Sequence, residues 1–356
     1  MPLFPTATEK RMPAPSLPLV NLVKVVAAQL ILWHHFALYG PMSDVVNPLA
    51  SSVSNWFLDY GPLAVQAFLA IGGFLAARSF LEKSGAFGMP ELPRRLLQRY
   101  RRLIPLLASA LLLAIVSAAL ARALIVHPTI PAPPTMLQLL AHLFLLQDIV
   151  GADALSAGVW YVAIDFQLFA LFALVQSLSG RRAIVACATL ATLSLFWLNR
   201  IPALDVWAPY FFGTYGLGVL ACWVSGQARR GAWGVLLGVL VIAALAVEWR
   251  SRIAVGGAMA LILAATGGHL TIKMTARRMI EALAEQSYAL FLVHYPVLLA
   301  VGAVVHRLWP FDPFANVAGL VAAWVCSLVL SWGLFQAVEA RRTRWQGVEK
   351  RGDASF

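Results

Sequence analysis

Charged residues are scarce in this chain of 356 residues, making up 12% of the total against 60% for hydrophobic residues. A soluble domain is about 25% charged and about 45–50% apolar. So few charged side chains do not cover the surface that a soluble protein of this length exposes to water. The composition, with a mean hydropathy of +0.77, therefore excludes a soluble protein and predicts a polytopic integral membrane protein.

Cysteine is scarce as well. The three cysteines, Cys187, Cys222 and Cys326, each lie inside an apolar run, and no pair has C-x-x-C spacing. This pattern supports neither a disulfide framework nor a zinc site. The sequence shows no other cluster of metal-ligating residues, so we expect no metal cofactor.

Acidic residues are outnumbered, with 16 Asp and Glu against 27 Lys and Arg and a formal net charge of +11. In a soluble protein this excess would suggest a nucleic-acid partner. In a membrane protein it has a simpler cause, because cytoplasmic loops collect Lys and Arg. We therefore expect the lipid bilayer as a partner and no nucleic acid.

Long apolar runs make up most of the sequence. A helix needs about 20 apolar residues to cross a bilayer, and ten segments meet this requirement: 17–39, 56–81, 100–125, 157–179, 182–199, 206–225, 231–248, 252–271, 286–308 and 315–338. The segment 135–149 is shorter and follows a proline-rich stretch, which favours a re-entrant or interfacial helix. The predicted fold is all-α, with about ten transmembrane helices and one short helix.

Basic residues set the orientation of these segments. If both termini are cytoplasmic, the outer loops hold Arg122, Arg200, Arg250, Arg252 and Arg307, Lys24 lies within the first span, and the other Lys and Arg residues fall on inner segments. This asymmetry favours cytoplasmic N and C termini. It also predicts one transmembrane domain over 1–338 and a short basic cytoplasmic tail over 339–356.

Ionisable residues inside the spans are the strongest functional signal, since each costs at least about 2.5 kcal/mol at a helix centre unless it is paired or solvated. By helical rise, His35 lies within about 10 Å of the outer edge, and Asp165 lies about 12 Å deep from the same side. We expect the two to meet, with the carboxylate orienting an imidazole base. A histidine bonded to a backbone carbonyl near the interface is the alternative interpretation.

Two arginines form a second ionisable group. Arg99 and Arg102 share one helix face within the run RRLLQRYRRLIP, next to the cytoplasmic boundary. Their spacing suits a clamp for phosphates, because guanidinium groups bind phosphate oxygens in pairs. A cluster that only sets topology is equally compatible with the spacing.

Five stretches, taken in order, carry a family resemblance. NLVKVVAAQLILWHHF resembles D-x-L-R-G-x-A-A followed by His-Phe, AFLAIGGFL resembles F-F-V-L-S-G-F-L, and RYRRLIP matches R-x-x-R-[IL]-x-P. WYVAIDFQLFAL resembles W-S-L-S-V-E-x-Q-F-Y, and QSYALFLVHYPVL matches S-Y-x-x-Y-L-x-H-x-P. The chain resembles the membrane acyltransferase 3 family of bacterial ten-span O-acyltransferases, in a stand-alone form without the esterase-like C-terminal domain. It departs from the pattern at Asn21, Lys24, Gly72 and Asp165.

The resemblance implies an acyl-CoA-dependent O-acyltransferase of the bacterial inner membrane, most simply an O-acetyltransferase using acetyl-CoA. The acceptor would be a sugar hydroxyl of a cell-surface polysaccharide or lipid-linked glycan on the far side. His35 and Asp165 would be catalytic, by direct transfer or through an acyl-histidine. The remaining site residues divide into donor-binding residues, Arg99, Arg102, Lys24, Tyr288 and His294, and acceptor-binding or lining residues, His34, Trp160, Gln167 and Ser287.

A transporter or a lipid or glycan flippase is the alternative function, in which the buried His and Asp would relay protons. Secondary transporters often carry interrupted helices at matching positions of two repeats. The sequence shows no such repeat, which weighs against a transporter.

Overall fold

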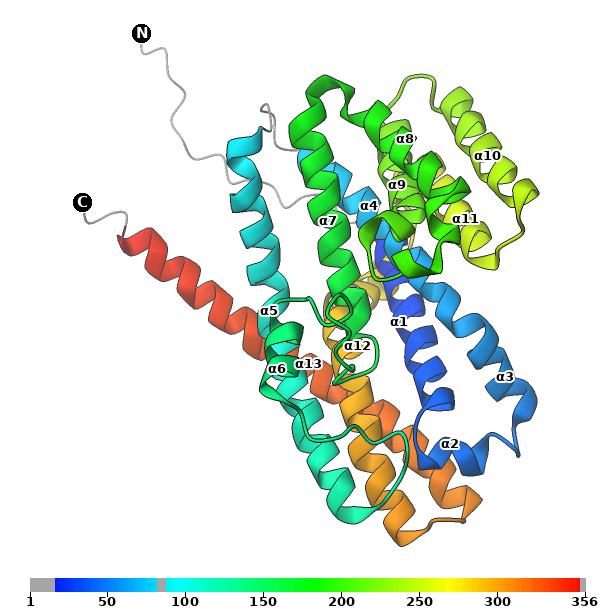
Figure 1. Ribbon diagram of the computed structural model, residues 1–356, viewed down its shortest axis with the longest axis vertical. Coiled ribbons are helices and arrows are strands. Elements are labelled where there is room, and N and C mark those ends of the chain that lie inside the picture. The colour runs from blue at the N-terminus through cyan, green and yellow to red at the C-terminus, as the bar shows by residue number, and fades with distance from the viewer. Residues whose placement is uncertain (1–16, 82–87, 353–356) are drawn as a thin grey trace.

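The computed structural model describes residues 17–81 and 88–352, with helices and no strand among them (Figure 1). The expected inner residues Lys10, Arg11 and Lys83 and the last four residues of the expected tail lie outside the described residues. Within the described ranges, eight helical segments are long and apolar enough to cross a membrane. The chain is thus an all-α polytopic membrane protein.

Each long helix overlaps one of the ten predicted spans. They are α1 (Pro18–Leu38), α4 (Ala64–Leu81), α5 (Leu92–Leu124), α7 (Val159–Ser179), α8 (Ala183–Phe196), α9 (Ala208–Ser225), α10 (Arg230–Val247), α11 (Ser251–Thr266), α12 (Met274–Leu308) and α13 (Pro313–Gly352). The short helices are α2 (Pro41–Val46), α3 (Ser51–Tyr60) and α6 (Met136–Leu143). Single 3₁₀ turns are η1 (Gly61–Leu63), η2 (Met89–Glu91), η3 (Gly180–Arg182), η4 (Leu198–Arg200) and η5 (Pro202–Leu204).

Two of the ten predicted spans, α9 and α11, are outside the eight segments that meet the length and hydropathy requirements. The α11 helix has 16 residues, a length of about 24 Å. The α9 helix lies inside the bundle, packed against α4, α8 and α11. Protein rather than lipid therefore surrounds much of α9.

Helices α4 and α9 approach each other closely because both carry glycine at the crossing. A Cβ atom on Gly73 would overlap the backbone of Tyr215 and Val219, and one on Gly218 would overlap the carbonyl of Ala70. Small residues allow this close approach between membrane helices, where packing replaces the hydrophobic effect as the source of association. The α4–α9 pair thereby ties α8, α9 and α11 to the N-terminal helices.

A second packing centre is α12, which contacts α1, α5 and α13. Figure 1 shows α5 and α12 running through much of the length of the molecule, with α13 crossing beside them. The α5 helix has 33 residues and α12 has 35, so each is about 50 Å long and exceeds the hydrocarbon thickness of a bilayer. The polar start of each helix, 92–102 in α5 and 274–285 in α12, provides the extra length.

The segment 135–158 enters the helix bundle instead of crossing it. The eight-residue α6 begins with a capping box between Thr135 and Gln138, and at about 12 Å it is too short to span a bilayer. The chain then returns to the bundle, and Gly158 at its end has φ +82°, which favours glycine. A Cβ atom there would lie 2.8 Å from the ring of Phe291, at the middle of α12.

Candidate functional site

His35 pairs with His294 inside the bundle. His35 comes from the last turn of α1, and His294 from the middle of α12. Their facing nitrogens, His35 Nδ1 and His294 Nε2, are 2.7 Å apart, and the two rings are nearly parallel, with an angle of 6°. The packing of α1 against α12 therefore joins two histidines that are far apart in the sequence.

The partners of His294 assign the tautomers of both rings. His294 Nδ1 lies 3.1 Å from the carbonyl oxygen of Leu290, and a carbonyl only accepts hydrogen bonds. The proton of neutral His294 is thus on Nδ1, and its Nε2 accepts the Nδ1 proton of His35. This arrangement leaves the lone pair of His35 on Nε2, which has no hydrogen-bond partner among the described residues.

His35 is the less buried member of the pair. Its Nδ1 donates to His294 and its Nε2 keeps a lone pair. The residue is 8% exposed, whereas His294 is fully buried. Tyr39 lies next to the His35 ring and packs edge-on against Tyr295. Neighbouring His34 uses Nδ1 to donate to the carbonyl of Phe57 in α3.

Asp165 does not pair with His35, and the expected contact between them is wrong. In the described part of the chain, the ion-pair partner of Asp165 is Arg99, whose Nη2 lies 2.5 Å from Asp165 Oδ2. Two further predictions change with this pair. Arg99 is neutralised by a carboxylate rather than left free for a phosphate, and Asp165 stabilises a guanidinium rather than an imidazolium.

The position of α7 explains the error. The depth estimate placed the start of α7 at the outer surface, but Gly158 lies beside Phe291 at the middle of α12. Asp165 follows seven residues later, about 10 Å further toward the end of the bundle where α5 begins. Figure 1 shows the lower end of α7 at mid-height of the molecule, well above the lower end of α5.

His142 fixes the chain segment that causes this shift. Its Nδ1 donates to the carbonyl of Gln138, and its Nε2 accepts from the amide of Leu155. Burial lowers the pKa of His142 below its ordinary value, because the charged form loses its hydration. A neutral His142 therefore holds α6 against the chain that leads into α7.

Three tyrosines surround the Arg99–Asp165 pair, and two of them were missed in the sequence. Tyr161, Tyr215 and Tyr288 all lie within electrostatic range of both charges. Tyr288 was predicted to belong to the site, and its hydroxyl donates to the carbonyl of Leu103. Tyr161 and Tyr215 sit in apolar runs where a tyrosine looks like any other packing residue, so no sequence signal marked them.

Basic side chains continue from this pair along α1 and α5. Lys24 lies within electrostatic range of Arg99 and Arg102, which groups three predicted donor-binding residues. The Nε of Arg99 is buried without a hydrogen-bond partner, so one donor of the guanidinium is unused. Lys24 and His35 are eleven residues apart on α1, which places them on one helix face about 17 Å apart.

The remaining predicted site residues make packing or capping contacts. Gln167 bonds the backbone of Val206 and Ala208 and thereby holds the start of α9. Ser287 donates to the carbonyl of Ala284 within its own helix. Trp160 packs against the ring of Phe211.

Comparison with known proteins identifies the family of the chain. The family model described as an acyltransferase domain matches residues 18–336, which is most of the chain. No curated protein and no solved structure matches the sequence. The matched region contains both histidines of the pair and the Arg99–Asp165 ion pair. The chain belongs to the acyltransferase 3 family and is a membrane acyltransferase.

Proposed function

We propose that this acyltransferase takes the acyl group of acyl-CoA, with acetyl-CoA as the expected donor, from the cytoplasmic face of a bacterial inner membrane. The acceptor is a hydroxyl of a cell-surface or lipid-linked glycan on the far face. The main support is the His35–His294 hydrogen bond, which orients His35 with a free Nε2 lone pair. A general base needs such an available lone pair and a partner that fixes its orientation.

In this mechanism, His35 Nε2 takes the proton of the acceptor hydroxyl while the hydroxyl oxygen attacks the thioester carbonyl carbon. The carbon–sulfur bond then breaks, and the CoA thiolate leaves and receives a proton from the imidazolium. His294 acts as a positioning residue, because it accepts the Nδ1 proton of His35 throughout. The corrected role of Asp165 is to hold Arg99.

The donor lies along α1 in this proposal. Lys24 and Arg102 provide positive charge for the CoA phosphates near the cytoplasmic end, and Asp165 holds Arg99 beside them. The acyl-pantetheine arm extends along the same face of α1 toward His35, over about 17 Å. This orientation requires both termini in the cytoplasm, as the distribution of basic residues predicts.

The decisive experiment measures CoA release from acetyl-CoA by purified protein with a thiol reagent present. We expect the release to fall by about 10²–10⁴-fold in His35→Ala. His34→Ala is the matched control, since it removes a neighbouring ring that bonds a backbone carbonyl, and a smaller effect is expected. Normal turnover in His35→Ala would refute His35 as the base.

Two further measurements separate the alternatives. Intact-mass analysis after incubation with acetyl-CoA detects an acyl-histidine, which would replace direct transfer with nucleophilic catalysis by His35. Acetyl-CoA binding tests the donor site: we expect it to persist in His35→Ala and to weaken in Arg102→Ala. Folded wild-type protein that binds no acetyl-CoA would refute this donor and return the transporter to consideration.

The positioning role of His294 predicts a particular kinetic pattern. His294→Ala removes the acceptor of the His35 Nδ1 proton and is expected to lower kcat by about tenfold or more. The KM for acetyl-CoA should stay unchanged. His294→Gln retains an oxygen acceptor and should recover part of the rate. Equal losses in the two variants would contradict a positioning role.

A further inference from the structure

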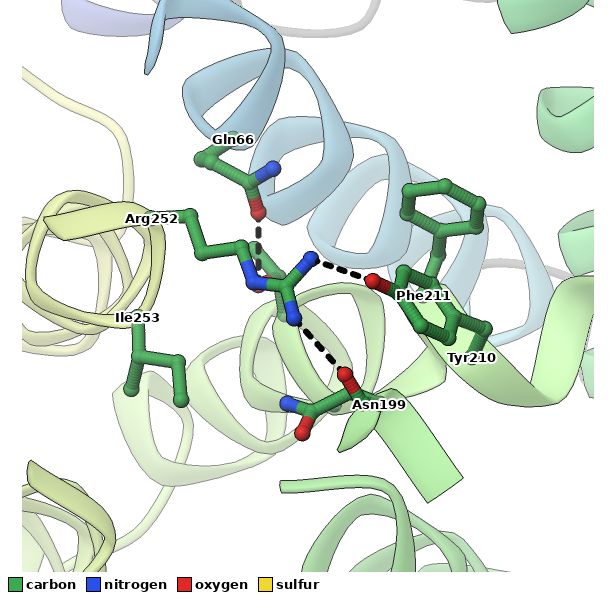
Figure 2. A pocket seen from close by; sticks show the side chains of 8 residues that line it. Gln66, Asn199, Tyr210, Phe211, Arg252 and Ile253 are labelled. Carbon is green, nitrogen blue, oxygen red and sulfur yellow. Dashed lines mark hydrogen bonds between the residues drawn. The ribbon is translucent and has the colours of Figure 1, made fainter. Parts of the chain in front are cut away.

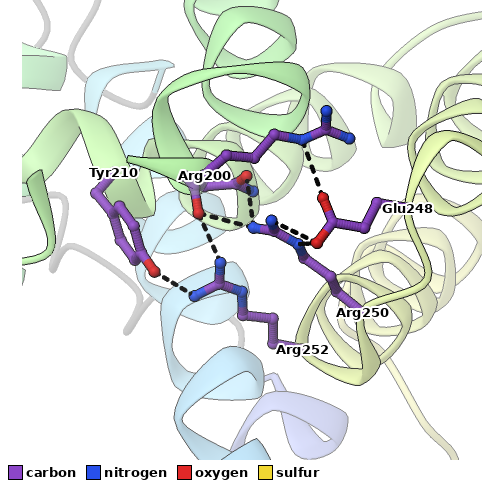
Figure 3. Close-up of polar contacts among 6 residues, drawn as sticks. Arg200, Tyr210, Glu248, Arg250 and Arg252 are labelled. Atoms are coloured by element: carbon purple, nitrogen blue, oxygen red, sulfur yellow. Dashed lines mark hydrogen bonds and ion pairs between the residues drawn. The ribbon is translucent and has the colours of Figure 1, made fainter. Parts of the chain in front are cut away.

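Three of the five arginines that the topology assigns to the outer loops come together in the fold. Arg200 ends η4, Arg250 precedes α11, and Arg252 lies in the first turn of α11. Figure 3 shows Arg200 and Arg250 on either side of Glu248, with Arg252 next to Arg250. We refer to these three residues as the outer arginine cluster.

The outer arginine cluster has more positive than negative charge. Glu248 pairs with Arg200 at 3.2 Å and with Arg250 at 2.6 Å. Arg252 instead bonds neutral groups, donating to the Tyr210 hydroxyl and the Asn199 carbonyl at 2.7 Å each (Figure 2). Among the residues that the structure describes, no carboxylate lies within ion-pair distance of Arg252. The cluster therefore holds three guanidinium groups and one carboxylate, and that carboxylate pairs with only two of them.

The hydrogen bonds of Arg250 and Arg252 hold Asn199 and Tyr210 in place, but they only partly compensate the positive charge of the cluster, because these partners are neutral. The Asn199 carbonyl accepts from both Arg250 and Arg252, one hydrogen bond for each of its two lone pairs. Positive residues are also disfavoured on the outer side of a bacterial membrane protein. The side chains are accessible to a ligand, with Arg200 34% exposed and Arg250 18% exposed.

Exposed tryptophans flank the outer arginine cluster. Trp197 precedes η4, Trp249 precedes Arg250, and Trp207 begins the turn into α9; they are 67%, 72% and 43% exposed. Tryptophan prefers the membrane–water interface, with its ring at the level of the lipid head groups. The arginines near these rings are therefore at the height where lipid phosphates lie.

We propose that Arg200, Arg250 and Arg252 bind the phosphate of an anionic lipid in the outer leaflet. Arginine suits this ligand, because its planar donors bind two phosphate oxygens at once. The same chemistry fits a phospholipid head group and the phosphate that joins a glycan to its lipid carrier. The site is separate from the His35–His294 pair, and its test does not depend on acyl transfer.

Glu248 allows a further test of the proposal, since its carboxylate forms ion pairs with two of the three arginines. The hydrogen bond from Arg250 lowers the pKa of Glu248, so its carboxylate stays ionised at neutral pH and competes with phosphate. Removing that charge should strengthen phosphate binding. A cluster that serves only to hold loops together would not respond in this direction.

Native mass spectrometry of the purified full-length protein, titrated with phosphatidylglycerol, tests the proposal, with phosphatidylcholine of the same acyl chains as the reference lipid. We expect Arg252→Gln and Arg200→Gln each to weaken phosphatidylglycerol binding by about tenfold. Glu248→Gln should bind it more tightly. Arg307→Gln, an exposed outer arginine outside the cluster, should match wild type.

Two additional probes identify the source of the phosphate. Tighter binding of a polyprenyl phosphate than of phosphatidylglycerol would assign the site to a glycan carrier, and the reverse order to a phospholipid. Binding of inorganic phosphate with no preference for the lipids would overturn the lipid assignment. Wild-type affinity in both cluster variants, or an equal loss in Arg307→Gln, would overturn the site. Arg200→Gln keeps the test valid if Arg252→Gln does not fold, because the polar partner of the Arg200 side chain among the described residues is Glu248 alone.

Discussion

The Arg99–Asp165 ion pair allows a quantitative test of how the bundle is held together. Breaking a fully buried pair by removing one partner costs about 3–5 kcal/mol, because the other charge is left uncompensated. The Asp165 side chain is 12% exposed and that of Arg99 is 28% exposed, so water offsets part of this loss. We therefore expect Asp165→Asn to lower the free energy of unfolding by about 2–3 kcal/mol.

Two comparisons make this expectation specific to the pair. Arg99→Gln combined with Asp165→Asn removes both charges, and replacing a whole buried pair is often close to neutral. The double variant should therefore be more stable than Asp165→Asn alone. The control is Glu281→Gln in the more exposed Arg277–Glu281 pair of α12, whose side chains are 38% and 31% exposed; this variant should cost less than about 1 kcal/mol.

Thermal unfolding in one detergent, followed by tryptophan fluorescence, measures these three variants and the single variant Arg99→Gln. The expected loss for Asp165→Asn corresponds to a fall in Tm of about 5 °C. A double variant whose loss equals the sum of the two single losses would show that Arg99 and Asp165 act independently. An Asp165→Asn variant as stable as Glu281→Gln would show that the pair does not support the bundle. Either result would refute the reasoning.

Two other predictions concern packing and pH. Gly73→Ala should destabilise the protein by about 3 kcal/mol, because its methyl group meets the backbone of α9. Gly72→Ala is the control, since its methyl group makes only ordinary contacts. Similar Tm values for the two variants would contradict the close α4–α9 contact. His142 has a pKa lowered by burial, so its contribution to stability is complete above its unfolded pKa of about 6.5 and decreases as the pH falls below that value. Hydrogen exchange at Leu155, corrected for intrinsic rates, should therefore speed up between pH 7.5 and pH 5 in wild type but not in His142→Gln.

Much of the fold could be predicted from the sequence, because apolar runs of bilayer length have few alternatives to a helix. The first predicted span, 17–39, became α1 with bounds Pro18–Leu38. Helices α5 and α12 start well before the predicted spans 100–125 and 286–308. The polar residues of these first turns favour a helix, but a search for apolar runs leaves them outside the predicted membrane spans.

The pairing of the site residues was harder to predict, since it depends on where each helix starts in depth. Asp165 was placed beside His35 by counting from an outer surface, and the segment ending at Gly158 moves that starting point to the middle of the bundle. The motif predicts that His294 belongs to the site. Its contact with His35, however, joins two residues that are 259 positions apart in the sequence. Helical periodicity contains no information about such a contact.

The interval between Lys24 and His35 makes α1 sensitive to changes in length. Eleven residues complete about three turns, so the two side chains are in phase on one face. Inserting or deleting one residue between them rotates one side chain by about 100° relative to the other. Such a change would place the ammonium and the imidazole on different sides of α1 even if every residue type were retained. The number of residues between positions 24 and 35 is therefore a stricter constraint on this helix than the identity of the apolar residues that fill the interval.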